Sequence, residues 1–137
     1  TLSLPQQYAK SQEQSATLNR LSRAIAPNVD NKTKCLWVFD GPTSLYTLSS
    51  SCLPTRYIYP DHLNNALERN ALGVEQTDEV ARILANGPPI IVTADTKFTI
   101  QNEDAGQLVE RAVTDHYREL TNGVLHGRTI RVWKRID

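Results

Sequence analysis

Blocks of apolar residues separated by polar turns predict alternating strands and helices. A continuous apolar run at residues 35–39 ends at Asp40-Gly41-Pro42, which is typical of a strand covered on both faces. A second short strand is predicted at residues 56–59, where Pro60 ends it. A third is predicted at residues 90–93, directly after a pair of prolines.

The helical spacing of apolar residues predicts four helices, and a β-hairpin is predicted after the last of them. Leu18, Leu21 and Ile25 recur at i, i+3 and i+7, so residues 6–26 are expected to form a helix with one narrow apolar stripe. Two more helices are predicted at residues 61–70 and 77–86. The fourth begins at the N-cap Asn102 and is expected to end at Asn122-Gly123. Residues 124–126 and 129–136 then predict a β-hairpin.

This order of elements predicts an α/β fold. We expect a three-layer sandwich with a mainly parallel sheet, because strands that alternate with helices pair in parallel through right-handed crossovers. The first strand would lie between the second and the third, in the order 2-1-3, and the C-terminal hairpin would add antiparallel strands beside the third. Residues 1–33 are interpreted as a helix and linker, and residues 34–137 as a single α/β domain.

Composition narrows the functional classes. The 137 residues carry 15 Lys and Arg against 15 Asp and Glu, so net charge does not indicate a nucleic-acid partner. No apolar run approaches the roughly 20 residues that cross a bilayer. The chain begins with Thr1, contains no Met and shows no signal-peptide pattern, so we expect a processed chain or part of a longer one.

Polar side chains gather after the predicted strands, where ligands bind in open α/β sheets. They include carboxylates, hydroxyls, an imidazole and an ammonium, which suit acid–base chemistry or a hydroxyl-rich ligand. The same residue types also cap helices and form turns, so both interpretations stay open. The candidates from these loops are Asp40, Thr43, Ser44, Tyr59, Asp61, His62, Asp95 and Lys97.

Motifs for the common cofactors are absent from the sequence. It contains no dinucleotide or phosphate-loop glycine motif, no hydrolase elbow and no zincin motif, so we expect neither a cofactor nor a metal ion. Cys35 and Cys52 lie 17 residues apart. They fit two buried thiols, and they also fit a single disulfide if the chain resides in an oxidising compartment.

One segment resembles a known family. Residues 52–63 contain Pro-x-Arg-Tyr-x-Tyr-Pro-x-His-Leu, and the surrounding residues 34–95 fit the same pattern through Gly41-Pro42 and Pro88-Pro89. This stretch is similar to the C-terminal soluble region of bacterial polytopic membrane glycosyltransferases. Those enzymes resemble the dolichyl-phosphate-mannose protein mannosyltransferases and the lipid A aminoarabinose transferase.

The resemblance implies an accessory role. Members of the family have many transmembrane helices, use a polyprenyl-phosphate sugar donor and place their acidic catalytic residues near the first helices. None of those residues maps onto this chain. The chain would then be a non-catalytic domain on the periplasmic side of the bacterial inner membrane. Its partners would be the transmembrane portion of the same polypeptide and a glycan or lipid-linked sugar.

Within this interpretation Arg56 joins the candidate ligand residues, because a guanidinium can grip a carboxylate or phosphate; an ion pair that fixes a strand edge is the alternative. Cys35 and Cys52 are expected to be oxidised in the periplasm. Two other functions remain open. The chain can be a free-standing small α/β enzyme that uses the crevice at the strand ends, or a periplasmic module that binds other proteins.

Overall fold

The fold is built on an open, mixed sheet of four strands. The computed structural model describes residues 1–57, 59–66, 75–95 and 101–137, apart from the side chains of residues 61 and 62. The strands are β1 (Leu36–Val38), β2 (Ile90–Ala94), β3 (Tyr117–Leu125) and β4 (Arg128–Arg135), in the order β1-β2-β4-β3. β1 and β2 run parallel, whereas β4 is antiparallel to both β2 and β3.

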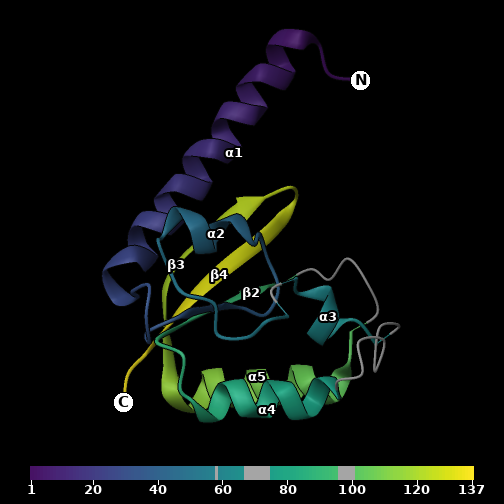
Figure 1. Cartoon of the computed structure of the whole chain (residues 1–137). Helices are drawn as coiled ribbons and strands as arrows, with labels where there is room; N and C mark the ends of the chain where they lie inside the picture. The colour runs from purple at the N-terminus through teal and green to yellow at the C-terminus, as the bar shows by residue number, and fades with distance from the viewer. Residues whose placement is uncertain (58, 67–74, 96–100) are drawn as a thin grey trace.

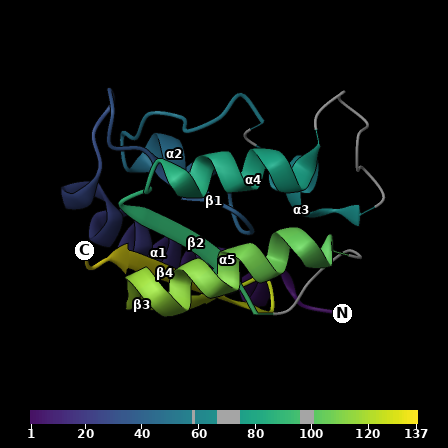
Figure 2. The same ribbon diagram turned by 90° about the horizontal axis from the view of Figure 1, so that it is seen from below.

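Helices cover both faces of this sheet. One face carries α1 (Leu4–Ile25), which continues into the short η1 (Ala26–Asn28), together with α2 (Ser44–Leu48). The opposite face carries α4 (Gln76–Ala85) and α5 (Glu103–His116), which lie side by side (Figures 1 and 2). The single-turn α3 (Asp61–Asn64) lies near the N-terminal ends of α4 and α5. The N-terminal half of α1 extends well past the sheet.

The apolar run at the first strand is explained by this arrangement. Successive side chains of a strand point to opposite faces. Leu36 and Val38 therefore join the core beneath α1 and α2, while Trp37 joins the core beneath α4 and α5. All three side chains are buried, which confirms the prediction of a strand covered on both faces.

The predicted second strand is wrong for the residues that are described. Arg56, Tyr57 and Tyr59 belong to no strand, and residue 58 lies outside the described part. β1 is consequently an edge strand and not the centre of a 2-1-3 order. Of the three strand pairs described, one is parallel, so the sheet is mixed and not mainly parallel.

The predicted end of the fourth helix is also wrong. α5 ends at His116, and Asn122-Gly123 lies in the middle of β3, opposite Arg131 and Ile130 of β4. The whole stretch pairs with β4 across a bulge between Glu119 and Thr121, and these long-range backbone bonds override the local helical preference. The hairpin itself is confirmed and is longer than expected.

The other helices agree more closely with the sequence. α1 begins two residues earlier than predicted, at a capping box in which Ser3 accepts from the backbone of Gln6, and Leu21 and Ile25 are buried as expected. α4 matches its prediction within one residue at each end. α3 covers the first four residues of the helix predicted at 61–70, of which residues 67–70 lie outside the described part. A helix apolar and long enough to span a membrane is not found in the described residues.

Candidate functional site

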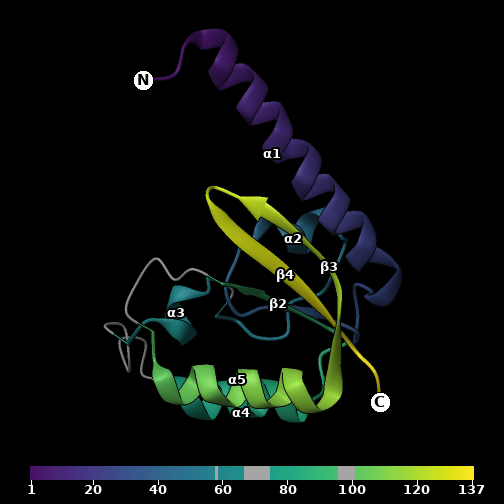
Figure 3. The same ribbon diagram turned by 180° about the vertical axis from the view of Figure 1, so that it is seen from behind.

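A cleft lies between α1, the loop after β1 and the tip of the β3–β4 hairpin. Its volume is about 810 Å³, within the range of small-molecule sites. Figure 3 shows how close α1 runs to β3 and the hairpin. We refer to this hollow as the α1 cleft, and its lining residues are Leu2, Gln7, Lys10, Ser11, Gln14, Ser15, Leu18, Asp40, Gly41, Pro42, Ser44, Tyr59, Pro60, Asn64, Leu125, His126, Arg128 and Ile130.

One wall of the α1 cleft is a single face of α1. Its residues recur at helical spacing from Gln7 to Leu18, and most of them carry short hydroxyl or amide side chains. The backbone N–H of His126, at the hairpin turn, donates to the side-chain oxygen of Gln14 at 3.2 Å. Further along α1, Arg20 donates to the hydroxyl of Thr121 and to the carbonyl of Asn122 in β3. These contacts hold the helix against the hairpin.

The floor of the α1 cleft contains an ion pair between Asp40 and Arg128. One terminal nitrogen of Arg128 lies 3.0 Å from each carboxylate oxygen of Asp40, and both residues are 8% exposed. Gln101 donates a further hydrogen bond to the same carboxylate at 3.2 Å. The two opposite charges of this buried pair compensate each other at the floor of the cleft.

The loop after β1 brings its backbone into the α1 cleft at Gly41. This residue has φ of +140°, and a Cβ atom there would lie 3.1 Å from a methyl group of Val92. Glycine therefore meets two requirements at once, a backbone angle that other residues rarely adopt and a close approach to β2. The loop continues through Pro42 into α2, whose first residue Ser44 also lines the cleft.

The remaining wall is held by buried amide side chains. Asn64 donates to the carbonyl of Phe39 at 2.7 Å and accepts at its own carbonyl from the backbone of Asn102. The side chain of Asn102 donates in turn to Gln76, which donates to the carbonyl of Asn65. These amides are 8% exposed or less. They join the starts of α4 and α5 to the segment that carries Tyr59 and Pro60 into the cleft.

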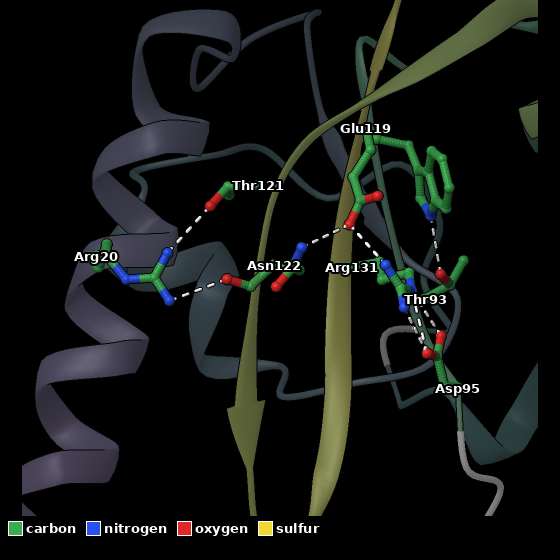
Figure 4. A network of polar contacts seen from close by, with 8 residues as sticks. Arg20, Thr93, Asp95, Glu119, Thr121, Asn122 and Arg131 are labelled. Carbon is green, nitrogen blue, oxygen red and sulfur yellow. Dashed lines mark hydrogen bonds and ion pairs between the residues drawn. The ribbon is translucent and has the colours of Figure 1, made fainter.

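A second hollow lies on the other face of the sheet, between α5 and the end of β2. Its volume is about 630 Å³, and its wall includes Asp95 and Trp133. Arg131 forms a double contact with Asp95 at 2.8–3.1 Å and also binds Glu119 (Figure 4). Hydrogen bonds from Arg131 keep the pKa of Asp95 below its ordinary value. The indole N–H of Trp133 donates to Thr93 at 2.9 Å.

The residues predicted from the sequence are distributed over several places. Asp40, Ser44 and Tyr59 come together in the α1 cleft, whereas Asp95 lies in the second hollow. Thr43 occupies the N-cap position of α2, but its side chain accepts no capping hydrogen bond. Arg56 is exposed outside both hollows, with its guanidinium 5.1 Å from the ring centre of Tyr57.

The side chains of three further candidate residues lie outside the described part of the structure. Asp61 and His62 are the first residues of α3, but their side chains lie outside the described part. Lys97 lies entirely outside the described residues.

Sequence reasoning missed the polar face of α1 and Arg128. The sequence predicts the helix from its apolar stripe at Leu18, Leu21 and Ile25, which assigns no role to its polar residues. The clustering of Gln and Ser at positions 7, 11, 14 and 15 is visible in the sequence, but only the packing of α1 on β3 shows that this face is a wall. Arg128 carries no sequence signal that distinguishes it from the other basic residues of the hairpin.

The two cysteines form a disulfide bond. Cys35 immediately precedes β1, Cys52 follows α2, and their Cα atoms are 4.8 Å apart. The bond closes a loop that contains β1, Asp40-Gly41-Pro42 and α2, so it fixes one side of the α1 cleft. In the described part of the chain, His, Cys, Asp and Glu side chains form no group of three that could hold a metal ion.

Comparison of the chain with protein-family models, curated proteins and solved structures finds no match.

Proposed function

We propose that this chain is an extracytoplasmic accessory domain of a membrane glycosyltransferase that uses a polyprenyl-phosphate sugar, and that it contributes a binding surface and not the catalytic residues. The observation that carries the proposal is the position of the segment at residues 52–63. Its described residues Tyr59 and Pro60 form a wall of the α1 cleft, next to Gly41 and Pro42 of the same resemblance. Four residues of the resemblance therefore line one hollow, whereas Pro54, Pro88 and Pro89 lie away from it.

The disulfide supports the proposed location. Disulfide bonds persist in oxidising compartments such as the bacterial periplasm and are rare in the cytosol. Cys35 and Cys52 are placed for such a bond by the turn of α2, and no other cysteine is present in the sequence. A periplasmic domain is the setting in which this bond would persist.

The ion pairs of Asp40 and Asp95 favour a binding role over a catalytic one. A general acid needs a raised pKa near neutral pH. Asp40 is paired with buried Arg128, and hydrogen bonds from Arg131 lower the pKa of Asp95. Both carboxylates are thus engaged in holding loops and strands together. This arrangement supports a domain that presents a preformed surface to a ligand.

The experiment that tests the proposal follows the native protein in cells. An antibody against the 137-residue chain should detect a membrane-associated protein much larger than 15.4 kDa. Protease added to spheroplasts should destroy the epitope, because the domain faces the periplasm. A cytoplasmic protein that the protease can cleave serves as the control, because it stays uncut only while the spheroplasts are intact. A small protein in the cytosolic fraction that is protected from the protease would overturn the proposal.

Deletion of the domain from the membrane protein supplies the functional readout. Removal of residues 1–137 should reduce sugar transfer from the lipid donor, whereas the isolated chain should transfer none. Transfer by the isolated chain would instead identify it as a free-standing enzyme.

A further inference from the structure

We infer that the α1 cleft binds a neutral saccharide, because a helix face made mostly of hydroxyl and amide side chains shares the cleft with an aromatic and proline wall, and the floor holds a buried ion pair. The inference rests on the proposed function for its biological setting, since it names the class of ligand that the accessory domain would bind. The site itself is argued from the described side chains.

The helix wall suits hydroxyl groups. Hydroxyl and amide side chains can both donate and accept, as a sugar hydroxyl also can. Gln7, Ser11, Gln14 and Ser15 present such groups along one face of α1. Residues 7 and 18, at the two ends of this face, are separated by about 16 Å of helix. The wall is therefore long enough for more than one sugar ring.

Another wall of the α1 cleft offers an apolar surface. Tyr59 is 58% exposed and lines the α1 cleft with Pro60 and Pro42. An aromatic side chain supplies a large contact area at a small cost in conformational entropy. The face of a sugar ring that carries C–H groups can pack against such a surface while the hydroxyls reach the helix.

The charges of the cleft argue against a phosphate ligand. Arg128 would be the natural anion-binding group at the floor, but it makes a two-oxygen contact with Asp40. A phosphate would have to replace that carboxylate or rely on the exposed residues Lys10 and His126 at the rim. A neutral ligand can occupy the same space without disturbing the buried pair.

The test is a titration of the 137-residue chain, followed by NMR of its backbone amides. The probes are the neutral tetrasaccharides maltotetraose, tetra-N-acetylchitotetraose and mannotetraose, with inorganic phosphate and a short-chain polyprenyl phosphate as separate arms. At least one tetrasaccharide should shift amides of residues 7–18 and 40–44 with a Kd in the millimolar range or tighter. Phosphate and polyprenyl phosphate should leave those amides unchanged.

Pairs of matched variants test whether the two walls of the α1 cleft contact the saccharide. Tyr59→Ala should weaken saccharide binding about fivefold to tenfold. Tyr8→Ala removes another exposed tyrosine, which is on α1 but does not line the cleft, and should leave binding unchanged. In the same way, Gln7→Ala should weaken binding while Gln12→Ala, outside the lining, should not.

The possible outcomes separate this inference from the proposed function. The inference is overturned if no tetrasaccharide shifts the cleft amides, if only the phosphate compounds do, or if Tyr59→Ala and Tyr8→Ala behave alike. Failure of the proposed function would instead appear in the fractionation and protease experiment. If the protein proves to be cytosolic and still binds a saccharide, the inferred binding site stands and the proposed periplasmic role is wrong.

Discussion

The hydroxyl oxygen of Tyr46 accepts a hydrogen bond of 2.9 Å from the backbone nitrogen of Val38. Two residues earlier, the backbone nitrogen of Leu36 donates to the hydroxyl of Ser51 at 2.8 Å. These two N–H groups belong to the edge of β1 that faces away from β2. Side chains from α2 and the loop after it thus take the place of a neighbouring strand, which protects the edge from pairing with another chain.

Replacement of Tyr46 by phenylalanine tests this protection. Tyr46→Phe keeps the ring in the core but leaves the buried N–H of Val38 without its acceptor. A buried unsatisfied donor costs about 1–3 kcal/mol, so we expect the free energy of unfolding to fall by that amount. Urea denaturation measures it. Tyr8→Phe, at an exposed position on α1, should change stability by less than about 0.5 kcal/mol, and equal effects of the two variants would argue against the role of Tyr46.

The raised pKa of Tyr46 predicts a loss of stability at high pH. Burial raises the pKa of Tyr46 from 10.0 to about 12. Between these values the unfolded chain has lost a proton that the folded protein still holds. The stabilisation is therefore complete below pH 10 and declines as the pH rises toward 12, by at most about 1.4 kcal/mol for each pH unit.

A comparison of the wild type with Tyr46→Phe isolates this titration. Burial also raises the pKa of Tyr117, but Tyr117 is present in both proteins. Urea denaturation near pH 9 and near pH 11.5 should show a steeper loss of stability in the wild type than in the variant. Parallel losses in the two proteins would mean that Tyr46 titrates normally in the folded state.

The edge of β1 also shows why the sheet order could be predicted only in part. The apolar runs at residues 36–39 and 90–93 are sufficient to predict two parallel, buried strands, and the parallel pairing of Leu36 with Ile90 confirms them. Whether residues 56–59 would add a strand depended on the outer edge of β1. Tyr46 and Ser51 occupy that edge, and side-chain hydrogen bonds of this kind leave no periodic signal in a sequence.

The candidate site was predictable to a similar extent. The rule that polar residues gather at strand ends pointed to Asp40, Ser44 and Tyr59, which do line one cleft. Their electrostatic state depends on Arg128, which is 88 residues from Asp40 in the chain and reaches it only because β4 pairs with β2. The helix wall depends likewise on the packing of α1 against β3. Such long-range contacts are set by the tertiary structure and not by local pattern.

The buried pair of Asp40 and Arg128 should be strongly coupled. Asp40→Ala removes the carboxylate that pairs with the buried guanidinium of Arg128, which is expected to cost about 3–5 kcal/mol. The double variant Asp40→Ala with Arg128→Met removes both charges and should cost less than the sum of the single changes. Urea denaturation of the four proteins measures this coupling.

An exposed pair provides the control for this cycle. Asp95 and Arg131 form a comparable two-oxygen contact, but their side chains are 45% and 33% exposed. Solvent screens such pairs, so Asp95→Ala should cost no more than about 1 kcal/mol. Additive effects at Asp40 and Arg128 would show that the pair does not behave as a buried unit.

The disulfide between Cys35 and Cys52 should stabilise the protein by limiting the freedom of the unfolded chain. Closing a loop of this length contributes about 3 kcal/mol in the chain-entropy model. Reduction with dithiothreitol is therefore expected to lower the free energy of unfolding by about that amount. The double variant Cys35→Ala with Cys52→Ala should show the lower stability with or without the reductant. Because the loop carries Asp40-Gly41-Pro42, reduction should also broaden or shift the amide signals of residues 40–44. Unchanged stability and spectra after complete reduction, verified by thiol titration, would show that packing alone holds this side of the cleft.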